Sequence, residues 1–322
     1  MSVPVFAARH VLAAVPPSEA LAAVRTAFVE HAQGRWLMPS KVYVPAPPDG
    51  DFRAMPASGA GHAVLKWVNS FPRNPERGLP TVAGVVLLSD AATGELRAVL
   101  DAAAVTALRT GAAAVLAAET LARPVDGAAA VIGCGVNGQA VARTFLARGR
   151  PVVVLDVRRE LAEAAAAKLG EGASVAAGLG QALACEILAT VTPGREPVFR
   201  AGDLRPGQHV SLMGADGPGK AEIEVAELLR TRIVCDEWEQ ASHNGDIARA
   251  VDAGRLERTG VAELGKVLCR EEAGRRSEEE TTAFDSTGLA VQDLAIALSV
   301  LDAYRADPGA DAFAGIGAID LD

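Results

Sequence analysis

A glycine-rich segment near the middle of the chain restricts the possible folds more than any other feature. Residues 133–138 read GCGVNG, with the spacing G-x-G-x-x-G, and lie between the apolar run AAAVI and the helix-like run QAVARTFLARG. Between a strand and a helix, such glycines permit a tight turn, close approach of a pyrophosphate group and close packing of helix on strand. The segment predicts a dinucleotide site at Gly133, Gly135, Val136, Asn137 and Gly138. The alternative is that the glycines only shape a turn.

An acidic residue follows at the distance that a dinucleotide site requires. Asp156 lies eighteen residues after Gly138, near the end of the apolar run PVVVLDV. A carboxylate at this point can accept hydrogen bonds from both ribose hydroxyls, and it would repel the additional phosphate of NADP. Arg158 could pair in part with that phosphate. These residues favour NAD as the cofactor, although Asp156 could also simply make a turn at a strand end.

The whole chain is expected to be an α/β protein of two domains, because 322 residues exceed one ordinary hydrophobic core. Residues 125–288 alternate apolar runs with helix-like segments, which is typical of the parallel sheet of a Rossmann domain. The runs EILATVTP, HVSLMGAD and RIVCDE continue this sheet to about residue 236. The charged stretch REEAGRRSEEE is expected to be a solvated surface segment or a helix start.

Residues 1–124 are expected to form an α+β domain, completed by residues 289–322. The patterns predict a helix over 18–33 with Ser18 as its cap, strands at KVYVPA, AVLKWVNSF, TVAGVVLLSD and LRAVLD, and an alanine-rich helix over 101–122 that ends before Pro124. We expect the strands to be antiparallel in part. The segment DSTGLAVQDLAIALSVLDAYRA opens with capping residues and carries an apolar stripe, so it should pack as a helix on the first domain.

Charge and cysteine content exclude several classes of protein. The net charge of −9 is spread along the sequence without a basic block, which argues against a nucleic-acid partner. The four cysteines lie far apart without a Cys-x-x-Cys pair, and the five histidines have no metal-ligand spacing, so neither a disulfide framework nor a metal site is expected. The N-terminus has no signal-peptide pattern, and no apolar stretch of about 18 residues avoids a charge. We expect a cytoplasmic protein without a membrane segment.

Cationic residues of the first domain are candidates for binding a small amino acid. Oxidation of an amino acid requires cations that hold its carboxylate and a group that exchanges protons with nitrogen and water. Lys41, Arg53, Lys66 and Arg109 are the candidates. Lys66 interrupts the apolar strand AVLKWV, where burial would lower its pKa toward the range of a base.

Each of these cations also has a purely structural interpretation. Lys66 could extend to water from a strand edge, and Lys41 and Arg53 could be ordinary surface cations. Arg109 could pair with Asp101 or Glu119 in helix packing. The sequence alone leaves these alternatives open.

Seven segments together make a resemblance to a known family recognisable. They occur in the order MPSKVYV, FRAMPA, LKWVNSFPRNPERGLPTV, LRTGAAA, VIGCGVNG, GADGPGKAEI and FDSTGLAVQD. In this the chain resembles the ornithine cyclodeaminase and mu-crystallin family over nearly its whole length. Within that family it is most similar to the archaeal-type alanine dehydrogenases, which have Lys and Arg at the positions of Lys41 and Arg53. Cyclodeaminases more often have Arg at the position of Lys41.

The resemblance implies an N-terminal substrate and dimerisation domain, an NAD domain and a site between them. It implies that Lys66 and Asp216 are the acid/base pair and that Lys41, Arg53 and Arg109 contact the substrate carboxylate or the cofactor. Asp216 could instead be a turn former before Gly217. The resemblance also implies further cofactor contacts at Thr81, Thr110, Thr192, Met213, Gly214, Ala215, Lys220 and Ser286.

The expected activity is NAD-dependent oxidative deamination of L-alanine to pyruvate and ammonia by a homodimer. The same machinery acting on ornithine or lysine would make a cyclodeaminase, in which hydride returns to the product after ring closure. A third possibility is a reductase of cyclic imines. The non-enzymatic possibility is a ligand-binding relative of the mu-crystallin type that keeps NAD. An intact Lys66 and Asp216 argue against this last class.

Overall fold

The computed structural model describes residues 2–193, 196–217 and 219–321, and the chain divides into two compact units. The first unit comprises Met1–Arg109 and Leu289–Asp322, and the second comprises Thr110–Gly288. The division falls inside helix α3 (Ala102–Leu121), whereas the sequence analysis placed it after residue 124. The second half of α3 belongs to the second unit because Gly111 packs tightly there: a Cβ at this glycine would lie 2.7 Å from the carbonyl oxygen of Ala140.

The first unit is built on a mixed sheet, and its strands at residues 42–101 confirm the predicted antiparallel run. Within the described residues the strand order is β15-β1-β6-β5-β4-β3-β2, with only β1 and β6 parallel. The sequence analysis did not predict β1, β3 and β15. The strands are β1 (Ser2–Phe6), β2 (Val42–Ala46), β3 (Gly50–Gly59), β4 (His62–Ser70), β5 (Val82–Asp90), β6 (Leu96–Asp101) and β15 (Gly317–Asp320).

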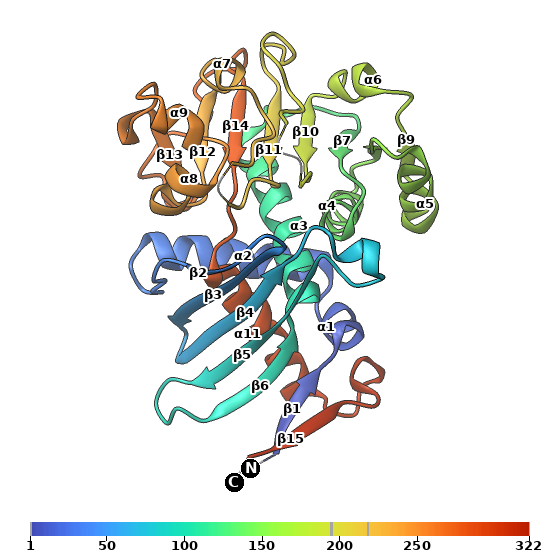
Figure 1. Cartoon of the computed structure of the whole chain (residues 1–322), viewed down its shortest axis with the longest axis vertical. Coiled ribbons are helices and arrows are strands. Elements are labelled where there is room, and N and C mark those ends of the chain that lie inside the picture. Colours follow the sequence, from blue (N-terminus) through green and yellow to red (C-terminus); the bar gives the residue numbers. More distant parts are fainter. Residues whose placement is uncertain (1, 194–195, 218, 322) are drawn as a thin grey trace. The chain divides into compact units, whose positions relative to one another are not determined.

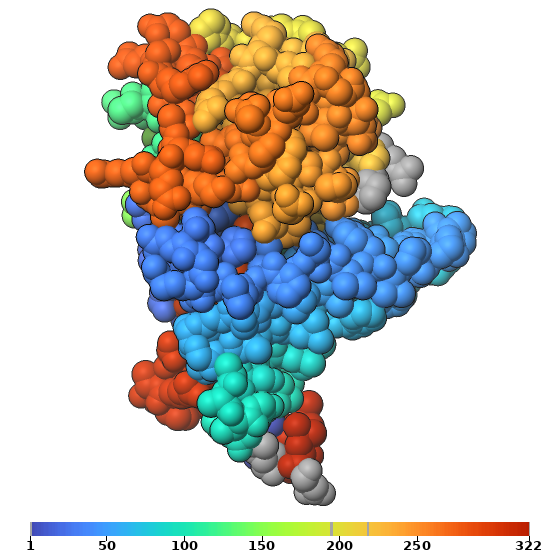
Figure 2. Space-filling view, turned by 90° about the vertical axis from the view of Figure 1, so that its left-hand side faces the viewer, coloured from blue at the N-terminus to red at the C-terminus, as the bar shows by residue number. Residues whose placement is uncertain are grey.

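Helices α2 (Pro17–Ala32) and α11 (Ala290–Ala306) pack together, and α11 also packs on β3, β4 and β5. In Figure 1 the red α11 runs along this sheet, as predicted for a C-terminal helix that returns to the first domain. In the space-filling view the red C-terminal segment lies against the N-terminal segments of the same unit (Figure 2). The unit also contains α1 (Ala8–Ala14) and the short 3-10 helices at Asn74–Arg77 and Asp311–Phe313.

The expected helix caps were wrong at both helices. Ser18 does not cap α2, since the helix begins one residue earlier with Pro17 at its first position. Proline fits there because its missing N–H would have no partner in the first turn. Helix α11 begins after Leu289, whose N–H donates to the side-chain oxygen of Gln292 at 3.3 Å. The Ser and Thr before it are engaged elsewhere, as described below.

The second unit contains a sheet whose paired strands all run parallel, as the Rossmann prediction requires. The order is β13-β12-β14-β11-β10-β7-β8-β9. The sheet does not end near residue 236 as expected, because β14 lies between β11 and β12 and β13 forms an edge. The strands are β7 (Ala129–Ile132), β8 (Val152–Leu155), β9 (Ala173–Val175), β10 (Ile187–Thr190), β11 (His209–Leu212), β12 (Arg232–Cys235), β13 (Val261–Glu263) and β14 (Thr282–Asp285).

The helices of the second unit connect these parallel strands (Figure 1). They are α4 (Val136–Ala147), α5 (Arg159–Leu169), α6 (Leu179–Leu183), α7 (Val225–Leu228), α8 (Trp238–Asn244), α9 (Ala248–Asp252) and α10 (Leu264–Leu268), with a 3-10 helix at Arg258–Gly260. Strand β7 has β8 on one side and β10 on the other, so the chain reverses its direction of winding beside β7. Open α/β sheets bind ligands at the carboxyl ends of the strands at such a point.

The charged stretch at residues 270–280 and helix α3 both show why composition alone is a poor guide to burial. The charged stretch at residues 270–280 contains no α-helix, and Arg275 is not fully solvated: it donates hydrogen bonds to the backbone oxygens of Leu121, Gly207 and Gln208. Helix α3 is long and apolar enough to cross a membrane by length and composition, but 83% of its apolar window is buried within the protein. This burial is that of a core helix.

Candidate active site

The predicted phosphate loop has the backbone geometry that a dinucleotide needs. Gly133 has φ +100°, and a Cβ at Gly138 would lie only 1.8 Å from the carbonyl oxygen of Gly133, so both positions require glycine. A Cβ at Gly135 would meet nothing within 4 Å, which leaves room beside the N-terminus of α4. The first backbone N–H groups of a helix bind phosphate well, because they have no partner within the helix. The residues present therefore fit the diphosphate of NAD.

Asp156 follows β8 and is tied to this loop. One carboxylate oxygen accepts a hydrogen bond from the Cys134 N–H at 2.8 Å, and the other accepts one from the Arg158 N–H at 3.0 Å. The turn-forming interpretation of Asp156 is thus correct, and it is compatible with ribose binding because a carboxylate accepts several hydrogen bonds. Burial and the charge of Asp156 raise the pKa of the Cys134 thiol to about 11, which disfavours its thiolate form.

The other predicted cofactor residues of this unit follow neighbouring parallel strands. Thr192 follows β10, residues 213–216 follow β11, and Ser286 follows β14. The sheet therefore brings them to the same edge as the phosphate loop. Lys220 does not point freely at a ligand: its Nζ lies 2.5 Å from a carboxylate oxygen of Asp216, the predicted acid/base residue.

A buried glutamate that the sequence analysis missed joins two of these loops. The carboxylate of Glu222 accepts hydrogen bonds from the Thr192 N–H at 2.7 Å, the Thr192 hydroxyl at 2.8 Å and the Gly214 N–H at 2.7 Å. Burial raises its pKa, while these hydrogen bonds lower it. Glycine is required at 214, because a Cβ there would lie 2.0 Å from the Thr192 carbonyl oxygen. Glu222 thus fixes the loops that carry predicted cofactor contacts.

Further buried carboxylates lie beneath this edge. Asp236 accepts hydrogen bonds from the Ser286 and Thr287 hydroxyls and from the Gly288 N–H, which explains why these residues do not cap α11. Burial, together with the charge of the neighbouring Asp236, raises the pKa of Asp285 to about 8. Among the described residues, no three His, Cys, Asp or Glu side chains are grouped as a metal site.

In the first unit, Lys66 is buried in the sheet and paired with an acid. Its exposed fraction is 2%, and its Nζ lies 2.9 Å from Oδ1 and 2.7 Å from Oδ2 of Asp293 on α11. Thr106 on α3 contributes its hydroxyl at 3.5 Å. The alternative in which Lys66 extends to water is therefore wrong.

Burial lowers the pKa of Lys66 to about 8, as the sequence analysis expected. The charge of Asp293 opposes this shift, whereas the positive charges of Arg109 and Arg53 add to it. A lysine with this pKa is neutral in part near pH 8, so it can both accept and donate a proton.

Two of the other predicted cations, Arg109 and Arg53, lie near this pair. Arg109 pairs with Asp293 at 3.9 Å rather than with the expected acids of its own helix region. Arg53 is buried on β3, pairs with Asp51 at 2.6 Å and lies on the same face of the sheet as Lys66. Lys41 immediately precedes β2 and is half-buried.

The two predicted threonine contacts differ in their surroundings. Thr81 is half-buried directly before β5. Thr110 follows Arg109 on α3 and is 1% exposed, and within the described part of the chain its hydroxyl makes no hydrogen bond.

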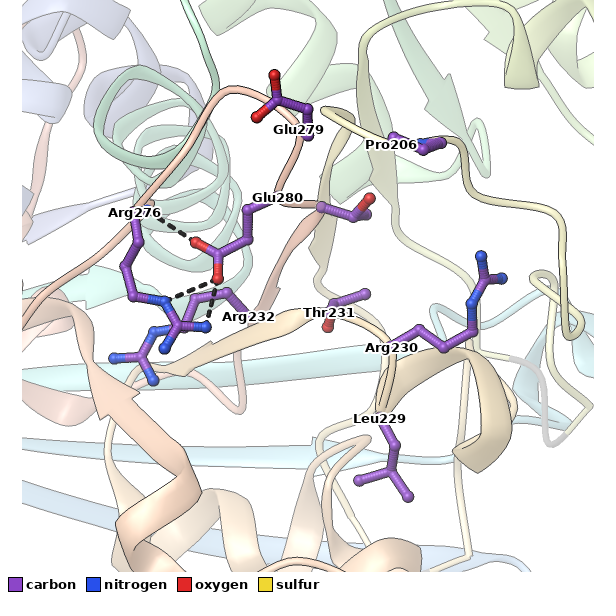
Figure 3. Close-up of a pocket in the computed structure, with 9 residues that line it drawn as sticks. Pro206, Leu229, Arg230, Thr231, Arg232, Arg276, Glu279 and Glu280 are labelled. Carbon is purple, nitrogen blue, oxygen red and sulfur yellow. Dashed lines mark hydrogen bonds and ion pairs between the residues drawn. The ribbon is translucent and has the colours of Figure 1, made fainter.

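One hollow of the second unit lies away from the predicted cofactor residues. It has a volume of about 370 Å³ and is lined by Arg230, Arg232, Arg276, Glu279 and Glu280, among others. Figure 3 shows Arg276 turned onto Glu280, with a distance of 2.8 Å between Arg276 Nε and the carboxylate. The hollow lies at the amino ends of β12 and β14, opposite to the edge where the phosphate loop lies.

Comparison with known proteins agrees with this geometry. The sequence model of the ornithine cyclodeaminase/mu-crystallin family matches residues 5–307. The chain belongs to this family. An alanine dehydrogenase of Archaeoglobus fulgidus is 44% identical over 292 residues, which are 88% of this chain and 89% of that protein.

Two solved structures show the same fold. An archaeal alanine dehydrogenase dimer with bound NAD superposes with a TM-score of 0.92 at 39% identity, covering 100% of both chains. The Δ1-pyrroline-2-carboxylate reductase of Thermococcus litoralis, in complex with NADH and L-proline, has a TM-score of 0.90 at 25% identity and covers 99% of this chain and 100% of its own. The predicted Rossmann fold and family are thus confirmed. The roles of individual site residues stay predictions.

Sequence reasoning missed Asp293, Glu222 and Asp236. Asp293 had a signal, because a single acid interrupts the apolar stripe AVQDLAIAL just as Lys66 interrupts an apolar strand. Two opposite charges in two apolar runs are the pattern of a buried ion pair, since either charge buried alone would cost on the order of several kcal/mol.

Proposed function

We propose that this protein is a cytoplasmic NAD-dependent alanine dehydrogenase. In the overall reaction, L-alanine, NAD⁺ and water give pyruvate, ammonium, NADH and a proton. The proposal is supported by a buried lysine with a pKa of about 8, in a chain that also has a glycine loop tied to Asp156 and suited to a dinucleotide. The similarity to alanine dehydrogenases over almost the whole chain supports the choice of substrate.

The cofactor would be held by the loop at residues 133–138, by Asp156 and by the loops around Thr192 and Met213. When bound, NAD supplies the acceptor for the hydride that leaves the alanine α-carbon. Asp156 favours NAD over NADP, because a carboxylate near the ribose repels a 2′-phosphate. Glu222 would hold the two loops in fixed positions relative to each other, since its carboxylate accepts a hydrogen bond from a backbone N–H of each.

The chain's own residues would manage the charges and protons of the substrate. Lys41, Arg53 and Arg109 would bind the alanine carboxylate. Neutral Lys66 would take a proton from the alanine ammonium, because a nitrogen lone pair must be available when hydride leaves the α-carbon. Asp216 would then act with Lys66 on the water that adds to the imine carbon, after which ammonia leaves and pyruvate forms.

The deciding experiment follows NADH absorbance while purified protein is incubated with NAD and a panel of amino acids. Alanine should give pyruvate and net NADH in equal amounts. A cyclodeaminase would convert ornithine or lysine into a cyclic amino acid without net NADH. A cyclic-imine reductase would consume NADH with pyrroline or piperideine carboxylates and leave alanine untouched. Proline formation from ornithine together with inert alanine would replace our proposal with the cyclodeaminase.

We also propose that two copies associate through the outer face of the first sheet. Val42, Ala54, Trp67 and Val85 stand opposite one another across four strands, on the face away from Lys66. The exposed fractions are 55% for Val42, 40% for Trp67 and 40% for Val85. An apolar patch of this kind is costly in water and marks an interface.

The archaeal alanine dehydrogenase with bound NAD is a dimer, which supports a second copy as the occupant of this face. Sedimentation should give a dimer for the wild type and a monomer for Trp67→Lys at micromolar concentration. A wild-type monomer would contradict this assembly.

A further inference from the structure

Asp293 is a buried acid that has no role in the reaction steps proposed above. It lies in the first turn of α11 with an exposed fraction of 0%, between the buried residues Gln292 and Leu294. A carboxylate in such a place is tolerated only when it is paired and hydrogen-bonded. Its partner is Lys66, which is separated from it by 227 positions in the sequence. The pair joins the C-terminal helix to the strand that carries the proposed base.

The geometry makes Asp293 the main contact of the Lys66 amine. Both carboxylate oxygens lie within 3 Å of Nζ, whereas the Thr106 hydroxyl is at 3.5 Å. Arg109 approaches the same carboxylate from α3, with its Nε 3.9 Å from Oδ1. Asp293 is thus shared by two cations. It retains a counter-charge from Arg109 at the moment when Lys66 is neutral.

We propose that Asp293 is the positioning residue that holds the Lys66 amine and supplies the counter-charge against which Lys66 takes up and releases its proton. This inference rests on the proposed function, because it assigns Asp293 a part in the same reaction. In the proposed alanine oxidation, Asp293 acts through Lys66 and does not itself contact the substrate.

The charges that face Lys66 determine whether loss of the Asp293 charge raises or lowers the pKa of Lys66. Arg53 on β3 and Arg109 on α3 are cationic, and Val86, its cross-strand neighbour on β5, is apolar. Burial, Arg109 and Arg53 all lower the pKa of Lys66, and Asp293 on α11 is the group that raises it. Without the Asp293 charge, the pKa of Lys66 would therefore fall below about 8. Lysine that is neutral at every working pH is a poor proton donor when the reaction runs toward alanine.

The first test measures the proton on Lys66 without any turnover. The chain has five lysines, so protein labelled with ¹⁵N at the lysine side chains gives few Nζ signals, and Lys66→Met identifies the relevant one. In Asp293→Asn the titration midpoint of Lys66 should fall by at least about one pH unit, the usual effect of losing an adjacent opposite charge. Asp302→Asn removes an exposed acid of the same helix and should leave the midpoint unchanged. An unchanged midpoint in folded Asp293→Asn overturns the proposal.

A second variant guards against misfolding of Asp293→Asn. Arg109→Gln removes a cation that lowers the pKa of Lys66, so the midpoint should rise instead of fall. Asp293→Glu keeps the charge, and its midpoint should lie closer to that of the wild type than to that of Asp293→Asn. A fall in Arg109→Gln would contradict the electrostatic arrangement described here.

The second test follows kcat for alanine oxidation against pH. The acidic limb of the profile should move to lower pH in Asp293→Asn by the same amount as the Nζ midpoint, a change that a merely structural defect would not produce. A shifted midpoint with an unmoved limb overturns the link to the reaction. The absence of amino-acid oxidation in the wild type, read from NADH absorbance, instead refutes the proposed function, and the Nζ titration separates the two failures.

Discussion

The second and third glycines of the phosphate loop, Gly135 and Gly138, should respond differently to substitution, although both belong to the same motif. A Cβ at Gly138 would lie 1.8 Å from the Gly133 carbonyl oxygen, whereas real Cβ contacts stay beyond 3.0 Å, so the turn would have to open by about 1.2 Å. A Cβ at Gly135 would meet nothing within 4 Å, and its φ of −67° suits alanine. Gly138→Ala should therefore damage the protein itself, and Gly135→Ala should not.

The magnitudes follow from packing. Forcing a methyl group into a closed contact costs about 2–3 kcal/mol, and 1 kcal/mol lowers Tm by about 2–4 °C in a unit of this size, so Gly138→Ala should lose about 4–12 °C. In Gly135→Ala the loss should stay below about 4 °C, because a weaker helix cap costs under about 1 kcal/mol.

Binding of NAD should respond differently from stability. The methyl group of Gly135→Ala would occupy the room into which the diphosphate must come, so affinity should fall at least about tenfold, or 1.4 kcal/mol. The assay is a titration with NADH followed by its fluorescence, beside thermal unfolding without cofactor. Wild-type affinity in Gly135→Ala would refute the placement of the phosphates, and an unchanged Tm in Gly138→Ala would refute the tight turn.

Three further predictions concern charge. Lys66→Ala should reduce alanine turnover by at least about a hundredfold at near-normal NADH affinity, while Lys168→Ala, an exposed control, should have no effect in the same assays. Asp156→Ser should erode the preference for NAD over NADP in the ratio of kcat/KM values, because the repelling charge is lost. Burial raises the pKa of Asp285 to about 8, so its neutral form stabilises the fold at acid pH and this contribution is lost as pH rises toward 8. As the pH rises from 5 to 8, the Tm of the wild type should therefore fall relative to the Tm of Asp285→Asn. Parallel plots of Tm against pH for the two proteins would contradict this.

The sequence predicted local elements of the fold well and their neighbours in space poorly. The strand, loop and helix around Gly133 were predictable because the motif, the apolar run and the acidic residue after β8 lie within 30 residues. Strand β14 was not, because its insertion between β11 and β12 depends on pairing partners that are distant in the chain. Strand β3 was missed since Pro56 interrupts its pattern. The proline is tolerated because β2 pairs only with Gly50–Ala54, which leaves one side of β3 unpaired at that point.

The candidate site divides in the same way. The burial of Lys66 and its lowered pKa could be predicted from an apolar strand, since both depend on the immediate neighbours of one residue. The pairing of Arg109 could not, because the acids of its own helix region are engaged otherwise: Asp101 accepts a hydrogen bond from the Ala104 N–H, and Glu119 pairs with Arg148. The true partner, Asp293, comes from the far end of the chain.

The return of the C-terminal segment to the first unit is therefore a chemical requirement as well as a structural one. A lysine buried in β4 without a counter-charge would have its pKa lowered by burial, Arg109 and Arg53 together, with no opposing group among those that shift it. Helix α11 supplies that group through Asp293, and the strand in turn neutralises an acid that α11 could not otherwise bury. Asp236 fixes the segment that leads into α11 by binding Thr287 and Gly288. Each half of the pair thus makes the other tolerable, which explains why a charge interrupts both apolar segments at positions that pack together.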